Sequence, residues 1–349
     1  MKLFKDILAE GESLFKNEEA LDFEYLPKLL PFREDQQRYM AECIKPLFQG
    51  RRGRNLFIYG YPGVGKTACV KSVFRELEEF TDNVVPCYVN CWKLETPFAI
   101  LSEIATQLDS FYHKKRSQEA LYAIQRKARK LKGIALAFDE IDKARNLDFL
   151  YKLLDLRNIT IFLITNRRDF LSNLELRLRS RLALESLELE PYTYEQTEII
   201  LKERLKLAFM PNVFPAEVFR EVVKATYKLK DIRVGLYLML EAGRFAERDG
   251  CKKIEMRHLD LAKEKYLEEF PIKSSPTTEE EKTILKLIKK NPGITTGELF
   301  QLFRKEGYQL PERTFRSYLK KLYEQNLVRR EPTSKGFRGK SMRWWLSYF

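Results

Sequence analysis

The chain is short of the features that mark secreted, membrane-spanning and zinc-binding proteins. Its longest apolar runs, such as Ile159–Ile164, fall far below the roughly 20 residues of a membrane-spanning helix. Five scattered cysteines, an odd number, predict free thiols in a reducing compartment. Cys87 and Cys91 lie close together, but no second pair follows and there are only two histidines, so no zinc site is expected. Residues 1–5 lack the apolar stretch of a secretory signal, which favours a cytoplasmic protein without a membrane partner.

Positive charge, in contrast, is plentiful. The 349 residues carry a net charge of +13, which indicates a polyanionic partner, and the length predicts two or three domains. Residues 313–343 hold ten Lys or Arg against two Glu, and so contribute +8 of that charge. Such a run is either a solvated face or a nucleic-acid surface, and the aromatic and apolar residues between the charges favour the second reading.

Residues 60–67, GYPGVGKT, fit the phosphate-binding loop pattern at every required position. Glycines let the main chain curl closely enough for its N–H groups to converge on phosphates, Lys66 can reach the outer phosphates, and Thr67 can hold Mg²⁺. A buried strand is predicted at 55–59 and a helix at 68–80, whose N-terminus favours bound anions. We therefore expect a nucleotide on this loop, held by Gly60, Gly63, Val64, Gly65, Lys66, Thr67 and Ala68.

Two other predicted strands end in polar residues. The strand at 134–138 runs into Asp139 and Glu140, and the strand at 159–165 runs into Asn166. Beside a phosphate-binding loop, Asp139 is suited to complete a Mg²⁺ shell and Glu140 to polarise the attacking water. An amide at Asn166 can bond the γ-phosphate or that water. A strand that merely ends in a polar turn is the alternative for each.

The chain reads as an α/β core followed by helices. Strands at 55–59, 84–90, 134–138, 159–165 and 183–189 alternate with helices, which predicts a parallel sheet covered by helices. Residues 1–30 are expected to be helical and residues 34–48 form an amphipathic helix. After Pro191 we expect an all-helical lid with helices at 193–208, 215–227, 231–249 and 256–269. The predicted domains are a nucleotide-binding core at 1–190, the lid at 191–270, a linker at 271–278 and a separate domain at 279–349.

The last domain has the pattern of a winged helix: three helices, at 279–290, from 294 and at 311–322, and then a hairpin. In the third helix Phe315, Leu319 and Leu322 are predicted to face inward. A cationic helix can enter a major groove, and a glycine-bearing wing can approach phosphates. The predicted double-stranded DNA contacts are Arg313, Arg316, Ser317 and Lys320 on the helix and Lys335, Arg338 and Lys340 on the wing. A winged helix used for protein contacts is the alternative.

The order of these parts resembles the AAA+ ATPases, and within them the archaeal origin-recognition and cell-division-control (Orc/Cdc) initiators. The resemblance covers residues 20–349. The stretches that carry it are LPFREDQ (30–36), NLFIYGYPGVGKTA (55–68), VNCWKLETPFAIL (89–101), FDEIDKARNLDFLYKLLDL (138–156), ITNRRDFLSNL (164–174), LEPYTYEQTEIILKERL (189–205) and DIRVGLYLMLEAGRFAERDG (231–250).

The resemblance implies further roles. Asn166 is similar to sensor 1 and Arg233 to the sensor 2 arginine of the lid, while Tyr192 and Arg204 match positions that line the nucleotide pocket. Arg181 matches the arginine finger that enters a neighbouring subunit's site, with Arg177 and Arg179 as competitors for that role. Lys230 stands where the family often has glycine. The basic segment 112–132 is either a solvated helix or a second DNA contact.

The resemblance implies a nucleoid-associated replication initiator that binds ATP or ADP with Mg²⁺ and recognises origin DNA. It also implies that ATP hydrolysis is slow and depends on assembly. Paralogous initiator subunits and the replicative helicase, which such a protein helps to load, are the implied partners. A regulatory or mobile-element ATPase acting at promoters or element ends would use the same parts, and a clamp-loader-like or helicase-like motor is a third hypothesis.

Overall fold

The computed structural model describes residues 13–109, 112, 117–270, 278–324, 328–332 and 342–346. The chain forms two compact units, Met1–Leu259 and Asp260–Phe349, and helix α11 (Met256–Glu269) crosses the division in the sequence. The predicted linker at 271–278 lies almost wholly outside the described residues. The finer division into core, lid and winged-helix domain therefore stays a prediction.

The first unit is built on a five-stranded parallel sheet. Its strands lie in the order β2-β3-β4-β1-β5, with bounds β1 (Leu56–Gly60), β2 (Val84–Asn90), β3 (Gly133–Asp139), β4 (Ile159–Thr165) and β5 (Glu185–Leu189). Every residue of β3 and β4 is buried, as expected for strands covered on both faces. The five predicted strands are all present, and β5 begins two residues late because Ala183 has a left-handed backbone at the end of a helix.

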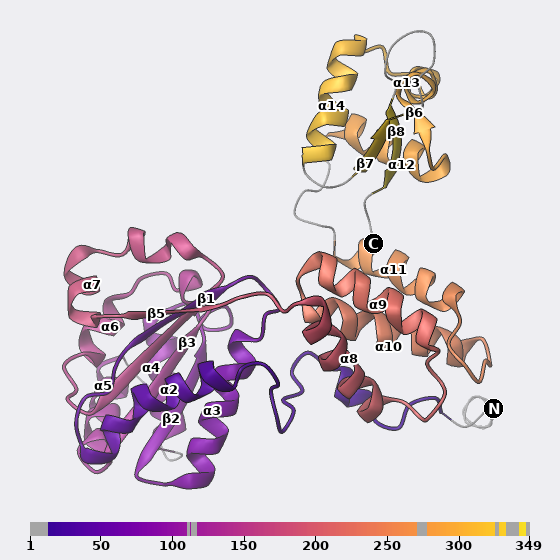
Figure 1. The fold of residues 1–349 in the computed structure, drawn as a ribbon. Coiled ribbons are helices and arrows are strands. Elements are labelled where there is room, and N and C mark those ends of the chain that lie inside the picture. Colours follow the sequence, from indigo (N-terminus) through magenta and orange to yellow (C-terminus); the bar gives the residue numbers. More distant parts are fainter. Residues whose placement is uncertain are drawn as a thin grey trace, which may run out of the picture. The chain divides into compact units, whose positions relative to one another are not determined.

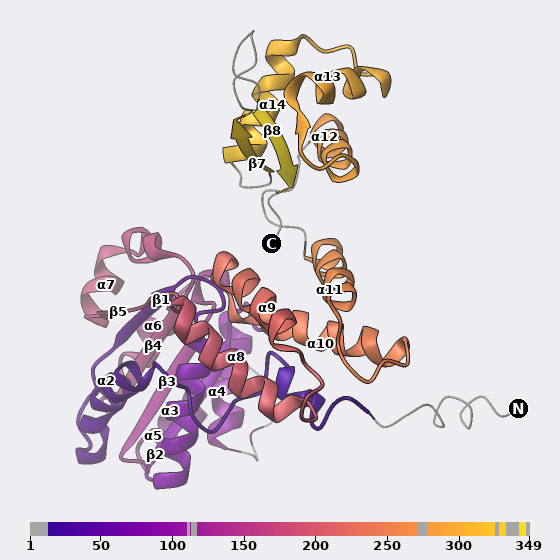
Figure 2. The ribbon, with the colours of Figure 1, turned by 45° about the vertical axis from the view of Figure 1, so that its right-hand side comes forward.

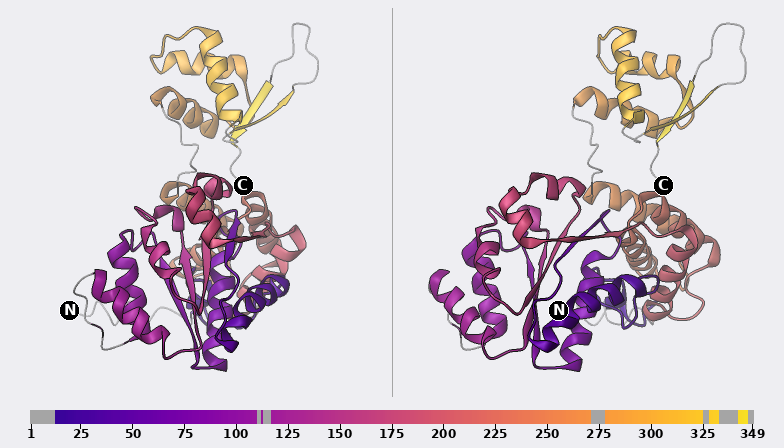
Figure 3. Two further views of the ribbon diagram at one scale, coloured as in Figure 1. Left: turned by 90° about the vertical axis from the view of Figure 1, so that its left-hand side faces the viewer. Right: turned by 60° about the vertical axis from the view of Figure 1, so that its left-hand side comes forward.

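Helices cover both faces of the sheet (Figures 1 and 3). On one face Ile58 packs with α2 (Glu34–Ile44) and α3 (Lys66–Phe80). On the other, Phe57 packs with α4 (Pro97–Leu108), α5 (Ser117–Ala128), α6 (Asp148–Leu153) and α7 (Leu176–Leu182). The predicted α/β architecture is confirmed. The helix predicted at 34–48 ends at Ile44 and continues as a 3-10 helix, Lys45–Gln49, because Pro46 lacks the N–H that an α-helix requires.

Helices α8 (Tyr194–Ala208), α9 (Ala216–Leu229) and α10 (Ile232–Arg248) pack together as the lid, followed by α11 (Figure 2). Their bounds match the predicted helices to within two residues. Thr193 begins α8 with a capping box, in which its hydroxyl accepts from the Gln196 N–H and the Gln196 side chain accepts from the Thr193 N–H.

The helical prediction for residues 1–30 is wrong where the structure describes it. Residues 13–30 contain only one short 3-10 helix, Glu18–Leu21. Their backbone carbonyls are used in tertiary contacts instead: Arg204 of the lid donates to the carbonyls of Ala20 and Tyr25, and Arg75 of α3 donates to that of Pro27. The contacts of this segment are thus largely tertiary, with side chains of α3 and α8. We call residues 13–29 the N-terminal strap.

The second unit has the winged-helix arrangement. Three helices, α12 (Glu279–Lys290), α13 (Thr296–Lys305) and α14 (Glu312–Glu324), pack with a sheet in the order β6-β8-β7, made by β6 (Ile294–Thr295), β7 (Val328–Pro332) and β8 (Met342–Leu346). Phe315, Leu319 and Leu322 are buried as predicted. Strand β6 was not predicted: Ile294 pairs with Trp344, and Thr295 then caps α13.

All five cysteines are free, as predicted. Cys43, Cys69, Cys87 and Cys91 are buried, and burial raises the pKa of the Cys87 thiol to about 12, so it stays protonated near neutral pH. Within the described ranges, the structure has no helix of the length and apolarity that a membrane crossing requires.

Candidate active site

The phosphate-binding loop connects β1 to α3 and depends on glycine at two positions. Gly63 has φ +69° and Gly65 has φ +88°, both in the left-handed region that other residues rarely adopt. A Cβ on Gly63 would lie 1.8 Å from Asp231 Oδ1 of the lid. The loop is thus shaped for glycine both by its own backbone and by the lid residue against it.

Lys66, the first residue of α3, is 6% exposed and folds back over the loop. Its Nζ donates to the carbonyls of Gly60 (3.0 Å) and Tyr61 (2.8 Å) and to Asn166 Oδ1 (2.5 Å). Burial lowers the pKa of Lys66 to about 8, against the opposing effect of the Asp139 and Glu140 charges. The ammonium is therefore held in the loop by neutral acceptors that a phosphate group can replace.

Thr67 and Asp139 meet at the carboxyl ends of the strands. Thr67 Oγ1 donates to Asp139 Oδ2 at 2.5 Å, and Tyr88 Oη donates to the same oxygen at 2.6 Å. Burial and the Asp139 charge raise the pKa of Tyr88, which keeps the hydroxyl a donor. One carboxylate and one hydroxyl are the hard oxygen ligands that suit Mg²⁺, which takes most of its remaining ligands from water and phosphate. The residues predicted to hold this cation are thus brought together.

Glu140 lies one residue beyond Asp139 in an unusual backbone conformation, with φ +51°. Left-handed backbone is uncommon outside glycine and asparagine and is often found at functional sites. Its carboxylate accepts from Asn166 Nδ2 at 3.1 Å, so Asn166 joins Glu140 to Lys66. Burial, with the charges of Asp139 and Asp142, raises the pKa of Glu140. A carboxyl with a raised pKa beside the phosphate loop is suited to accept a proton from water.

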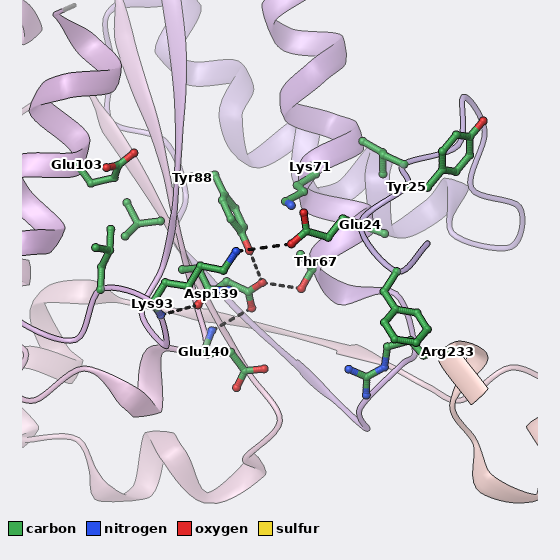
Figure 4. Close-up of a pocket in the computed structure, with 16 residues that line it drawn as sticks. Glu24, Tyr25, Thr67, Lys71, Tyr88, Lys93, Glu103, Asp139, Glu140 and Arg233 are labelled. Carbon is green, nitrogen blue, oxygen red and sulfur yellow. Dashed lines mark hydrogen bonds and ion pairs between the residues drawn. The ribbon is translucent and has the colours of Figure 1, made fainter. Parts of the chain in front are cut away.

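Part of this site, including Thr67, Asp139 and Glu140, lines a pocket of about 580 Å³, whereas Lys66 and Asn166 are not among its lining residues. Figure 4 shows Thr67, Tyr88, Asp139 and Glu140 gathered there, with Arg233 approaching from the lid. The N-terminal strap supplies one wall, and its Glu24 forms a 3.6 Å ion pair with Lys93. The lining residues are Phe23, Glu24, Tyr25, Leu26, Thr67, Ala68, Lys71, Tyr88, Val89, Asn90, Lys93, Leu94, Glu103, Asp139, Glu140 and Arg233.

The lid reaches the loop through Asp231 and Arg233. Asp231 caps α10 by accepting from the Arg233 N–H at 2.9 Å, and its carboxylate also accepts from Arg233 Nη2 at 2.6 Å. The Ile232 N–H donates to the Gly63 carbonyl at 3.4 Å. Lys230, at the position where the resemblance implies that the family often has glycine, adopts φ +55°, a conformation that glycine favours. Arg233 thus lines the pocket, where the resemblance placed it. Asp231, which was not among the predicted site residues, holds it there.

Tyr192 and Arg204 lie away from this pocket's lining. Arg33 stacks over the Tyr192 ring at 4.0 Å and donates to its hydroxyl at 3.0 Å, while its Nη2 bonds the carbonyls of Val64 and Glu190. Arg33 was not among the predicted site residues, although it belongs to the LPFREDQ stretch. Arg204 bonds the strap carbonyls and stacks over Tyr25. It therefore supports a pocket wall and does not itself line the described cavity.

The candidate finger residues lie on α7, away from this chain's own loop. Arg177, Arg179 and Arg181 are all exposed, next to Leu176, which is 80% exposed. Arg181 Nη2 forms a 2.8 Å ion pair with Asp155. The arrangement leaves the choice among the three arginines open.

In the winged-helix unit, all four predicted helix residues are exposed on α14: Arg313, Arg316, Ser317 and Lys320. Arg316 forms a 2.7 Å ion pair with Glu312 one turn earlier. The predicted wing residues Lys335, Arg338 and Lys340 lie outside the described residues. The helical half of the predicted DNA surface is therefore solvent-facing, as the periodicity predicted.

The described part of the basic segment 112–132 contains α5, which packs one face into the core. Ala120 and Ile124 are buried, whereas Arg126 reaches Asp109 at 2.8 Å from the other side. A helix, which was one of the two alternatives for this segment, is therefore present. Whether its charged face contacts DNA stays a prediction.

Three family models match successive parts of the chain. Residues 50–174 match an AAA domain, residues 198–264 a Cdc6 AAA+ ATPase-type lid domain, and residues 282–338 the ribonuclease R winged-helix domain.

Curated relatives match over most of their length. The chain is 31% identical over 326 residues to ORC1-type DNA replication protein 1 of Sulfurisphaera tokodaii, covering 87% of this chain and 82% of the relative. It is 31% identical over 353 residues to ORC1-type DNA replication protein 2 of Methanosarcina mazei, covering 96% and 94%. Among solved structures, the Aeropyrum pernix Orc1 protein in complex with DNA is 26% identical, with a TM-score of 0.66 over 97% of this chain and 95% of that one.

The resemblance that the motifs predicted is confirmed by these full-length matches and by the order of the matched domains. The fold, with its parallel sheet, helical lid and winged helix, agrees with the same conclusion. This chain belongs to the family of ORC1-type DNA replication proteins and has the AAA+ ATPase fold.

Proposed function

We propose that this protein is an ATP-dependent replication initiator that recognises origin DNA through its winged helix. One observation supports the part of the proposal that concerns ATP. Lys66, Asn166 and Glu140 form a continuous bonded chain beside the Thr67–Asp139 pair, and Thr67, Asp139 and Glu140 line one pocket. Phosphate binding, cation binding and water activation are therefore available within hydrogen-bond reach of one another.

In the proposed reaction ATP binds with its phosphates on the loop, and Lys66 exchanges its bonds to the loop carbonyls for bonds to phosphate oxygens. Thr67 and Asp139 would hold Mg²⁺, which supplies positive charge to the phosphates. Glu140 accepts a proton from the attacking water, and Asn166 orients that water or the γ-phosphate. Arg233 would leave Asp231 to contact the γ-phosphate, because a charged phosphate oxygen competes directly with a carboxylate for a guanidinium.

Hydrolysis is proposed to be slow and to depend on assembly. The support is the position of Arg177, Arg179 and Arg181: they are exposed on α7 and so are available to a neighbouring subunit. An arginine supplied in trans stabilises charge that develops only in the transition state. Paralogous initiator subunits are the proposed neighbours, and nucleotide state would then act as a switch on DNA engagement.

The part of the proposal that concerns DNA binding is supported by α14 and by the relatives. Arg313, Arg316, Ser317 and Lys320 are exposed on one helix of a winged-helix unit, which is the element that such domains place in a major groove. The relative from Aeropyrum pernix was solved in complex with DNA. We extend the proposal to the wing residues Lys335, Arg338 and Lys340, to nucleoid association, and to help in loading the replicative helicase.

A genome-wide map of the DNA bound by this protein in growing cells tests the proposal. A few sharp peaks at replication start sites are expected, together with a shared sequence beneath them. Peaks at promoters or at the ends of mobile elements would instead support a regulatory or mobile-element ATPase. That outcome would leave the ATP chemistry standing and remove the initiator function.

A further inference from the structure

Tyr88, on β2, belongs to no motif by which the site was predicted, yet it contacts the centre of that site. Its hydroxyl donates to Asp139 Oδ2 at 2.6 Å, the same oxygen that accepts from Thr67 at 2.5 Å. The other carboxylate oxygen, Oδ1, accepts from the Glu140 N–H at 3.0 Å. Figure 4 shows the Tyr88 and Thr67 hydroxyls converging on this carboxylate.

The strand register explains why Tyr88 can reach Asp139. Tyr88 lies opposite Ala137 in the parallel β2–β3 pair, and Ala137 lies two residues before Asp139. Side chains two apart in a strand project from the same face, so Tyr88 and Asp139 share the face that α3 covers. The small side chain of Ala137 leaves space between them for the tyrosine ring.

Tyr88 is also fixed from outside the sheet. Strand β2 is an edge strand, and the side-chain amide of Gln107 on α4 occupies that edge at Tyr88. Gln107 Oε1 accepts from the Tyr88 N–H at 3.0 Å, and Gln107 Nε2 donates to the Tyr88 carbonyl at 2.9 Å. Lys71 Nζ lies 4.9 Å from the centre of the Tyr88 ring. Backbone, ring and hydroxyl of Tyr88 are all therefore held in place.

Resting on the nucleotide site proposed above, we propose that Tyr88 is a positioning residue whose hydroxyl orients the Asp139 carboxylate for the divalent cation that accompanies the nucleotide. In the structure two hydroxyls hold Asp139 Oδ2. Thr67 would offer a lone pair of its oxygen to the cation while its proton stays on Asp139, so Tyr88 is the hydroxyl donor to that carboxylate that is not itself a proposed cation ligand. Hydrogen bonds to a metal-binding carboxylate typically change metal affinity by about 10- to 100-fold.

This role differs measurably from simple support of the fold. An orienting hydroxyl affects only the Mg²⁺-dependent part of nucleotide affinity, whereas a packing residue affects binding with and without Mg²⁺ alike. Tyr88→Phe keeps the ring and removes the bond to Asp139. Tyr39→Phe is a matched control, because the Tyr39 hydroxyl also donates to a carboxylate, that of Glu185, at a position outside the pocket lining.

The experiment measures the affinity of the full-length wild type and the two variants for a fluorescent ATP analogue, with Mg²⁺ and with EDTA. We expect Tyr88→Phe to reduce the Mg²⁺-dependent gain in affinity by about tenfold, with EDTA affinity within about twofold of wild type. Tyr39→Phe should match wild type in both conditions. Gln107→Ala removes the two side-chain bonds to the Tyr88 backbone. It should also reduce the Mg²⁺-dependent gain in ATP affinity, by a smaller factor than Tyr88→Phe does.

An unchanged Mg²⁺-dependent gain in Tyr88→Phe would overturn the inference, and so would an equal loss of affinity in both conditions. If the wild type itself bound no nucleotide, the proposed function would fail first and the role of Tyr88 would fail with it. The wild-type measurement therefore separates the two failures.

Discussion

Side chains of the nucleotide site bond one another, whereas those predicted to contact DNA face solvent. Lys66 is 6% exposed and Asp139 is 3% exposed. On α14, by comparison, Arg313, Arg316 and Lys320 are all exposed. A buried, mutually bonded group fails when any member is lost, because its partners are left unsatisfied. An exposed charged face loses affinity one contact at a time. The two regions should therefore differ sharply in their response to single substitutions.

The largest effect is expected at Lys66. Lys66→Ala removes the cation that reaches the outer phosphates, and we expect ATP affinity to fall by at least about 100-fold, or about 2.7 kcal/mol. Equilibrium binding of a fluorescent ATP analogue measures this loss. The melting temperature of the variant is measured alongside to show that it is folded. Retained affinity in a folded variant would remove Lys66 from the site.

The loop glycine offers the next test. Gly63→Ala places a Cβ 1.8 Å from Asp231 Oδ1, in addition to adopting a left-handed backbone. Gly250→Ala is the matched control, since Gly250 has φ +66° and nothing within 4 Å of its Cβ. The control should cost about 1 kcal/mol of unfolding free energy from backbone strain alone.

Gly63→Ala should cost roughly 2 to 4 kcal/mol and also weaken ATP binding, because overpacking adds to strain. Denaturant unfolding and ATP titration of both variants measure the difference. Equal costs in the two variants would show that Asp231 does not pack on the loop as described.

The buried Lys66 also gives the site a dependence on pH. Below pH 8 the ammonium is charged both with and without nucleotide, so ATP affinity should not change through this group. Above its pKa of about 8 the free protein loses the proton, and bound phosphates must restore it. Affinity should therefore fall by up to about tenfold for each pH unit above 8. Calorimetric titration between pH 7 and 9.5 measures this, and a flat profile would contradict the assigned burial effect.

The smallest effect is expected on the exposed face. Arg316→Ala should weaken DNA binding by roughly three- to tenfold and lower the slope of log affinity against log salt by about 1, while ATP affinity stays unchanged. Lys282→Ala is a matched control, because Lys282 is exposed on α12 in a 2.7 Å ion pair with Glu279, much as Arg316 pairs with Glu312. Fluorescence anisotropy at several salt concentrations measures both. Equal loss in the two variants would mean that α14 is not the contact surface.

Much of the core site could be predicted because its residues are contiguous in the sequence or end neighbouring strands. The spacing of residues within Gly60–Thr67 is enough to predict the loop. The carboxyl ends of parallel strands meet at one edge of the sheet, which brings Asp139, Glu140 and Asn166 together. The face of α14 followed from helical periodicity in the same way. At these positions local sequence patterns are sufficient to predict the structure.

The parts that were missed depend on pairs far apart in the chain. Tyr88 meets Asp139 through a strand register, and Arg33 meets Tyr192 across the junction of core and lid. Residues 13–30 were expected to be helical, but they are held by tertiary contacts, among them the bonds that Arg75 and Arg204 donate to their carbonyls. Tertiary contacts of this kind override local preference, and no spacing within the sequence encodes them.

The most direct test of the central claim is ATP hydrolysis by Glu140→Gln. Glutamine keeps the size of the side chain and its bonding to Asn166 but cannot accept the proton from water. Under assembly conditions in which the wild type hydrolyses ATP, the variant should bind ATP with wild-type affinity and leave it unhydrolysed over hours of incubation, as measured by chromatography of the bound nucleotide. Glu103→Gln, at another glutamate that lines the pocket, should hydrolyse ATP as the wild type does. Wild-type turnover by Glu140→Gln would contradict the account.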